Sequence, residues 1–237
     1  MGQRNKSDLL DARMLSQMIV TARKDQIKVP IINKQGEEIK ELIKYYQLIS
    51  KQKTQNKNHL ESIVAKDGSS IVSKSLNQEI KLLKKKEKDI LTAIKQLISK
   101  DPELHQAFLN IQSIKGVGEI SAIVLLYHFI KYPDANQKQI VSLAGLDPIK
   151  RNSGTSINGK ARISKAGSKL CRGVLFMAVL SAINFNEELK TFYERLKENG
   201  KHSTVAQIAV MRKMIIISHS LYKNNKVYEP EKYLEYT

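Results

Sequence analysis

The stretch that decides the fold is LNQEIKLLKKKEKDILTAIKQL, residues 76–97, in which aliphatic side chains recur every three or four positions. A similar apolar run extends from Ile39 to Ile63, and the segment Asp67-Gly68-Ser69-Ser70 separates the two runs. A sustained heptad favours helices that pack side by side, and a Gly-Ser segment ends a helix. The two runs therefore predict either an antiparallel helical hairpin or a dimerising coiled coil.

Polar and charged residues interrupt and surround these runs. Lys53 and Asn56 occupy seam positions of the first run, and Glu87 interrupts the second. Such charge is either a solvated helix face or a surface for nucleic acid, and the sequence leaves both open. The lysines that surround the second run are Lys81, Lys84, Lys85, Lys86 and Lys88.

The composition indicates an anionic partner. The 237 residues carry a formal net charge of +17, and the sequence pI is about 9.8. Nucleic acid is the commonest anionic partner of such a chain. A membrane is the weaker alternative, because we find no apolar run long enough to span a bilayer and no signal peptide. The single cysteine, Cys171, excludes an internal disulfide and favours a reducing cytoplasm.

The rest of the chain is expected to be helical. A helix is expected from Lys6 to Val20, and another begins with the cap Asp101 followed by Pro102. No stretch predicts a sheet, so the expected fold class is all-α. Later helices are expected at Ala135–Ala144, Leu170–Ile183 and Glu187–Glu198, with Arg172 pointing outward and a long last helix capped by Ser203.

Two glycines lie between the helix that begins at Pro102 and the next one. The first helix ends at Lys115-Gly116-Val117-Gly118, and the second begins at once. Glycines let the backbone approach a phosphate, and the start of a helix presents amide N–H groups to it. The pattern resembles the helix-hairpin-helix motif of non-specific DNA binders, with Lys115, Gly116 and Gly118 as contacts. A tight turn between packed helices needs glycine as well.

Ser153-Gly154 is the most informative feature for function. A serine hydroxyl beside clustered cations suits attack on a phosphodiester, because the cations stabilise the charge of the transition state. A Ser-Gly pair after Pro148 also suits a simple turn. The cations near Ser153 that we predict to contact DNA are Lys150, Arg151, Lys160, Arg162, Lys165, Lys169 and Arg172.

Two acids lie near the start of the chain. Asp8 and Asp11 are three positions apart, so a helix places both carboxylates on one face, where they can share a divalent cation. Acids in the first turn of a helix also favour its dipole. The spacing alone therefore leaves a metal site and a structural role open.

Several ordered motifs in residues 111–229 resemble the C-terminal domain of the insertion sequence 110 family of transposases, which is also found in Piv-type DNA invertases. Near the N-terminus, Lys6-Ser7-Asp8-Leu9-Leu10-Asp11-Ala12 resembles the end of that family's RuvC-like domain. Ordered motifs are much more specific together than singly. In the C-terminal half they are Ser113–Gly118, Ala144–Pro148, Ser153-Gly154, Ile163–Gly167, Leu170–Arg172 and Val205-Ala206 leading to Arg212-Lys213.

The resemblance implies a DNA recombinase of a mobile element. Asp8 and Asp11 correspond to the last two acids of the family's Asp-Glu-Asp-Asp site for Mg²⁺, and Ser153 corresponds to its serine nucleophile. DNA is the implied substrate, an oligomer brings two DNA sites together, and many members use a structured guide RNA. From charge we infer that Arg162, Lys165 and Arg172 stabilise the phosphate, and that the coiled coil joins protomers into a homo-oligomer.

The start of the chain departs from the family pattern. Met1 lies seven residues before Asp8, which leaves no room for the strands that carry the first two acids. We therefore expect a truncated transposase that binds Mg²⁺ weakly or not at all and is inactive alone or depends on a full-length partner. The alternatives are a non-catalytic regulatory protein that binds DNA or RNA, and a basic helical scaffold.

The expected organisation has three parts. Residues 1–30 would be a remnant of the RuvC-like domain, residues 31–100 a coiled-coil hairpin, and residues 101–237 the C-terminal transposase domain. The expected location is the cytoplasm of a bacterium or archaeon, at the nucleoid, with no membrane partner.

Overall fold

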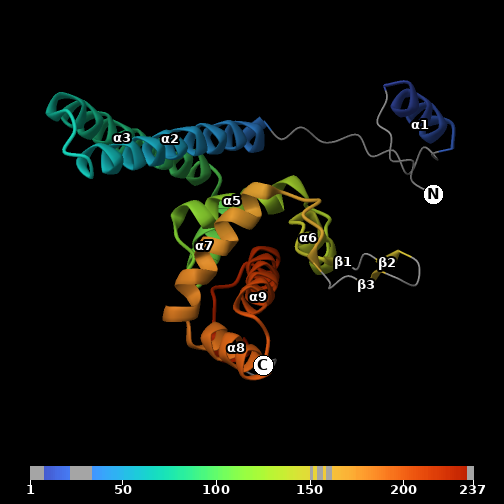
Figure 1. The fold of residues 1–237 in the computed structure, drawn as a ribbon. Helices are drawn as coiled ribbons and strands as arrows, with labels where there is room; N and C mark the ends of the chain where they lie inside the picture. Colours follow the sequence, from blue (N-terminus) through green and yellow to red (C-terminus); the bar gives the residue numbers. More distant parts are fainter. Residues whose placement is uncertain (1–7, 22–33, 150–151, 154–156, 159–161, 234–237) are drawn as a thin grey trace. The chain divides into compact units, whose positions relative to one another are not determined.

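The computed structural model describes residues 8–21, 34–149, 152–153, 157–158 and 162–233 (Figure 1). The chain divides into two compact units, Met1–Asn33 and Lys34–Thr237, which are described separately. Within the described residues there are nine α-helices and four strands of two residues each. The all-α prediction is therefore confirmed.

The N-terminal unit contains helix α1, Asp8–Thr21, which agrees with the helix predicted for this segment. Its apolar side chains are exposed, because the described part of this unit is a single helix with nothing to bury them. They include Met14, Leu15, Met18, Ile19 and Val20, with exposed fractions from 57% to 82%.

Helices α2, Lys34–Val64, and α3, Ser70–Ser99, lie along each other and are joined by a short turn (Figure 1). Of the two alternatives left open by the heptads, the chain forms the antiparallel hairpin within itself. Pairing of two chains through this hairpin remains a prediction. The apolar heptad residues of α3 face α2 and are buried, among them Ile80, Leu83 and Ile94.

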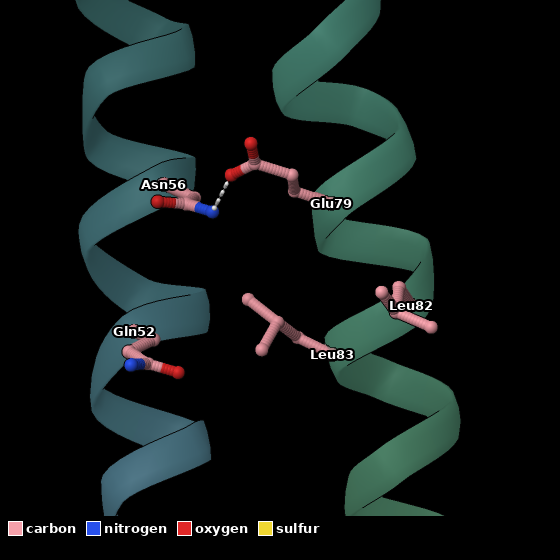
Figure 2. Close-up of a pocket in the computed structure, with 5 residues that line it drawn as sticks. All are labelled: Gln52, Asn56, Glu79, Leu82 and Leu83. Atoms are coloured by element: carbon pink, nitrogen blue, oxygen red, sulfur yellow. Dashed lines mark hydrogen bonds between the residues drawn. The ribbon is translucent and has the colours of Figure 1, made fainter.

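The polar residues that interrupt the two runs meet across the hairpin. Lys53 of α2 forms an ion pair with Glu87 of α3. One turn farther from the base, Asn56 Nδ2 donates to Glu79 Oε2 at 2.8 Å (Figure 2). A polar pair in an apolar seam fixes the register of two helices, because any slip leaves a charge without a partner.

The remaining helices follow the predicted order closely, and the base of the hairpin packs on the first two of them. Asp101 caps its helix as predicted: its carboxylate accepts from the amides of Glu103 and Leu104. The predicted cap Ser203 is wrong, because His202 accepts from the Thr204 amide and Ser203 is the first helical residue. These helices are α4 Pro102–Gln112, α5 Glu119–Lys131, α6 Gln137–Leu143, α7 Lys169–Phe185, α8 Glu187–Glu198 and α9 Ser203–Asn224, followed by the 3₁₀ turn Pro230–Tyr233.

Residues 34–237 form one compact unit, so the predicted boundary near residue 100 stays a prediction. None of the described helices is by itself long and apolar enough to cross a bilayer. Only α7 and α8 taken together meet that test of length and composition, and they are bent by 96°.

The core holds a histidine that is sensitive to acid. His128 of α5 is buried, and its Nε2 has no hydrogen-bond partner among the described residues. Burial lowers the pKa of His128 to about 4, although a hydrogen bond with the Ile140 backbone acts in the opposite direction. Burial also lowers the pKa of the nearby His219.

We expect the free energy of unfolding to fall as the pH falls from about 6.5 to about 4. The unfolded chain takes up a proton near the ordinary histidine pKa, whereas folded His128 stays neutral until about pH 4. The loss attributable to His128 is about 3 kcal/mol, since each unit is worth about 1.4 kcal/mol. Urea unfolding at pH 7.5 and 4.5 measures it, and a His128→Gln variant should lose less stability on acidification than the exposed-site control His105→Gln. Equal pH dependence in the two variants would contradict this assignment.

Candidate functional site

The segment around Ser153 forms a β-ribbon, which corrects the prediction that no stretch forms a sheet. Strand β1, Pro148–Ile149, pairs antiparallel with β4, Arg162–Ile163. Strand β2, Asn152–Ser153, pairs with β3, Ile157–Asn158, so Ser153 lies opposite Ile157. A strand of two residues is too short to show an alternation of polar and apolar side chains, which is why the sequence did not predict these strands. We call these four paired strands, residues 148–149, 152–153, 157–158 and 162–163, the Ser153 ribbon.

The ribbon is anchored by a buried turn, Ala144–Leu146, which follows α6. Backbone bonds join the two ends of the ribbon below β1 and β4. The Ser164 amide donates to Asp147 O at 2.9 Å, and the Lys165 amide donates to Gly145 O at 3.1 Å. The Ser164 hydroxyl also donates to the Asp147 carboxylate. The two strands therefore leave the helical core at a fixed spacing.

Two glycines allow this close approach. Gly145 has φ of +69°, in the left-handed region. A Cβ on Gly167 would lie 2.0 Å from the Leu143 carbonyl oxygen, and one on Gly145 would lie 2.6 Å from Arg172 Nη1. No side chain fits at either position without moving the backbone or Arg172.

Two arginines from distant helices hold the turn. Arg172 Nη1 donates to Ala144 O at 3.0 Å and to Gly167 O at 2.9 Å. From α9, Arg212 Nε donates to Leu146 O at 2.7 Å. Burial lowers the pKa of Arg212, and the nearby Asp147 opposes that shift. Both guanidinium groups thus bind backbone carbonyls at the base of the ribbon.

The structure alters the predicted role of Arg172. Its side chain was expected to point outward and stabilise a phosphate, but it is half-buried and donates to two carbonyls. We expect Arg172→Met to lower the free energy of unfolding by roughly 2–3 kcal/mol, because two carbonyls lose a charged donor. Urea unfolding measures this. The exposed Arg162→Met is the control, with an expected change within about 0.5 kcal/mol; similar losses in both variants would contradict the assigned role.

The other predicted DNA contacts near the ribbon fall into two groups. Lys150, Arg151 and Lys160 lie outside the described residues, and so does the side chain of Ser153. The second group is exposed beside the base of the ribbon and consists of Arg162, Lys165 and Lys169. Lys165 has φ of +57°, an unusual conformation for a side-chain-bearing residue. The exposed cations therefore remain candidates for contact with a phosphate.

The Gly116 turn is built for packing. Gly116 has φ of +103°, and a Cβ there would lie 2.6 Å from Ala182 Cβ of α7. Gly118 precedes α5 and has open space around it, and the Lys115 side chain is exposed. The close helix contact explains Gly116 fully, while Lys115 and Gly118 stay available for the predicted contact with DNA.

The described residues do not supply a magnesium site. Asp8 and Asp11 open α1, but their side chains lie outside the described part. In the described ranges we find no group of three or more His, Cys, Asp or Glu side chains that could hold a metal. Two carboxylates fall short of the six oxygen ligands such ions prefer, so we derive no step through Mg²⁺.

The single cysteine is not part of the candidate site. Cys171 is fully buried, and burial raises the pKa of its thiol to about 12. A thiol with so little thiolate at neutral pH is a poor nucleophile. Cys171 is therefore a small residue of the core.

Sequence reasoning missed the residues that hold the ribbon. Arg212 was named only as part of a sequence motif, with no structural role, and the hydrogen bond between Ser164 and Asp147 was not foreseen. The one signal in the sequence for these contacts was the ordered set of family motifs. The motifs concerned are Ala144–Pro148, Ile163–Gly167 and Leu170–Arg172. In the fold these motifs meet at the base of the ribbon.

Comparison with known proteins identifies this region. Residues 109–194 match the family described as Transposase IS116/IS110/IS902. Over these residues the chain is similar to the transposases of this family. The matched region includes Ser153 and the turn Ala144–Leu146, so the family resemblance predicted from the motifs is confirmed there.

Three relatives align with part of the chain. The pilin gene-inverting protein of Moraxella bovis is 31% identical over 139 residues, which make up 56% of this chain and 42% of that protein. The protein of the same name from Moraxella lacunata is 30% identical over 138 residues, again 56% and 42%. The "Insertion element IS110 uncharacterized 43.6 kDa protein" of Streptomyces coelicolor is 28% identical over 130 residues, 54% and 31%. The aligned stretches span less than half of each relative.

Proposed function

We propose that this chain acts in DNA recombination for a mobile insertion element, with Ser153 as the nucleophile. The observation that carries the proposal is that specific contacts hold the base of the Ser153 ribbon in place. A turn, two glycines and the donors Arg172 and Arg212 hold its two ends in one geometry. A nucleophile needs such support to meet a phosphodiester in line.

The proposed step is a transesterification. The Ser153 Oγ forms a bond to phosphorus, and the bond from phosphorus to one deoxyribose oxygen breaks. That oxygen takes the serine proton and leaves as a hydroxyl, so the DNA end stays linked to the protein as a phosphoserine. We assign the stabilisation of the negative charge that develops on the phosphate to Arg162, Lys165 and Lys169, which are exposed beside the base of the ribbon.

Names of the relatives support the class of reaction. Two are described as gene-inverting proteins and one belongs to an insertion element. We further propose DNA as the substrate, pairing of chains through the α2–α3 hairpin, and Asp8 and Asp11 as this chain's contribution to a Mg²⁺ site. A structured guide RNA is part of the same proposal.

A second candidate is a non-catalytic protein that binds DNA or RNA. The observation in its favour is the exposed group of cations Arg162, Lys165 and Lys169, which can bind a phosphate without any chemical step. The formal net charge of +17 suits either function.

The experiment is a search for a covalent adduct. Labelled element-end DNA is incubated with the protein and Mg²⁺, with and without a longer family member, and resolved on a denaturing gel. The adduct band is digested, and the modified peptide is located by mass spectrometry. A phosphoserine at Ser153 supports recombination. Salt-sensitive binding without an adduct in any mixture would favour the non-catalytic function, and modification at another residue would overturn the assignment of Ser153.

A further inference from the structure

The outer surface of α3 carries exposed lysines in regular order. Lys81, Lys85 and Lys88 follow the i, i+4, i+7 spacing that places side chains on one face of a helix. Lys74 lies seven positions before Lys81, and Lys84 flanks the same row. All five are exposed, and we call them the lysine face.

The lysine face lies opposite the seam of the hairpin. Leu76, Ile80, Leu83 and Ile90 are buried against α2. At 3.6 residues per turn, the positions of the lysine face point away from these residues. The fold therefore holds the lysines outward along one straight helix, and the packing of α3 uses none of them.

Two of the three acids of α3, Glu79 and Glu87, are turned toward α2. Glu87 pairs with Lys53 across the seam. Glu79 accepts from Asn56, and Figure 2 shows its side chain reaching toward α2. Asp89 lies at the edge of the face and forms no ion pair with a described cation. The five lysines thus have no ion-pair partner within the described ranges.

Helix α2 offers a useful contrast, because its charges are mixed. Its lysines are interspersed with the acids Glu37, Glu38, Glu41 and Glu61. Lys40 pairs with Glu37. A mixed face is the ordinary state of a solvated helix, whereas a face of one sign attracts a partner of the opposite sign.

We propose that the lysine face of α3 is a docking surface for the phosphate backbone of duplex DNA, separate from the site at Ser153. Its span from Lys74 to Lys88 is fourteen residues, or about 21 Å at 1.5 Å per residue. One strand of duplex DNA carries a phosphate about every 3.4 Å of helix axis, so a row of lysines about 21 Å long spans several phosphates. Lysine suits this role because it binds a phosphate as a point charge and reads no base.

The inference deepens the proposed function, since it names a second contact with the same DNA. The test compares two variants that each lose four positive charges. One carries Lys81→Gln, Lys84→Gln, Lys85→Gln and Lys88→Gln. The matched control carries Lys34→Gln, Lys44→Gln, Lys51→Gln and Lys57→Gln, all exposed positions of α2. Both are made in a Ser153→Ala background, so binding is measured without chemistry.

Affinity for a 30-base-pair DNA duplex is measured from 50 to 300 mM salt, with an RNA duplex of the same length in parallel. We expect the α3 variant to lower the slope of log K against log salt by about 3, since each phosphate contact contributes about 0.9. The α2 control should lower it by less than about 1. Circular dichroism and thermal melting confirm that both variants keep the hairpin.

Equal salt slopes for the two variants would overturn the proposal. The lysine face would then be only a solvated helix surface. A decrease in the salt slope that is seen only with the RNA duplex would overturn the assignment to DNA. The two proposals can fail separately. A lower salt slope in the α3 variant, without any adduct in the covalent assay, supports docking and rejects recombination. An adduct together with an unchanged slope supports recombination and rejects docking.

Discussion

Ser153→Ala is expected to abolish the covalent protein–DNA adduct, with a loss of at least about 10³-fold in strand exchange. The alanine side chain has no oxygen, so it cannot form the bond to phosphorus that links the DNA to the protein. Denaturing gels with labelled element-end DNA measure the adduct. The salt dependence of DNA binding should not change, because the variant removes no charge.

Ser156→Ala is the matched control, since it removes a hydroxyl three positions later in the sequence. It should keep the adduct at close to the wild-type level. An adduct that survives in Ser153→Ala, or one that is lost in both variants, would mean that Ser153 is not the nucleophile.

Gly167→Ala is expected to lower the free energy of unfolding by about 3 kcal/mol or more and to abolish adduct formation. A Cβ at this position would lie 2.0 Å from Leu143 O and 2.6 Å from the Gly145 amide nitrogen. Both neighbours are backbone atoms, so relief requires the turn Ala144–Leu146 and the ends of the ribbon to move apart. Urea unfolding and the adduct assay measure the two effects.

Gly173→Ala provides the control on α7. Apart from the backbone of α7 itself, no atom lies within 4 Å of a Cβ at Gly173, an exposed position in the middle of that helix. Alanine there should raise the free energy of unfolding by up to about 1 kcal/mol, because glycine is the poorer helix former. A small effect of Gly167→Ala, similar to that of Gly173→Ala, would show that the base of the ribbon tolerates a change in its backbone.

Much of the fold could be predicted because its signals are local. The heptad of residues 76–97 places apolar side chains along one face, interrupted at Glu87, and that face became the seam of the hairpin. Asp101 and Pro102 set the start of α4 within one turn. Patterns of this kind need only the spacing of neighbouring residues, which the sequence states directly.

The Ser153 ribbon could not be predicted, for the opposite reason. Each strand has two residues, and each is defined only by pairing with a strand elsewhere in the chain. The cap at His202 was missed because histidine is an uncommon cap, whereas serine at the next position is a common one.

The candidate site was predicted in part. Ordered motifs pointed to Ser153 and to the family, and the match over residues 109–194 confirms the family. The individual roles of the cations were harder to assign, because charge alone does not tell a structural donor from a phosphate ligand. Arg172 and Arg162 have the same side chain, yet only Arg172 is bonded to the turn.

The sequence by itself determined the helices, the hairpin seam and the family resemblance. Periodicity, caps and ordered motifs depend only on the order and spacing of residues along the chain. Tertiary structure decided how the ribbon is held. Arg212 reaches Leu146 across 66 positions, and Gly167 fits only because the Leu143 carbonyl lies against it. Such contacts depend on where folded helices bring distant backbone atoms together, and no local pattern encodes that distance.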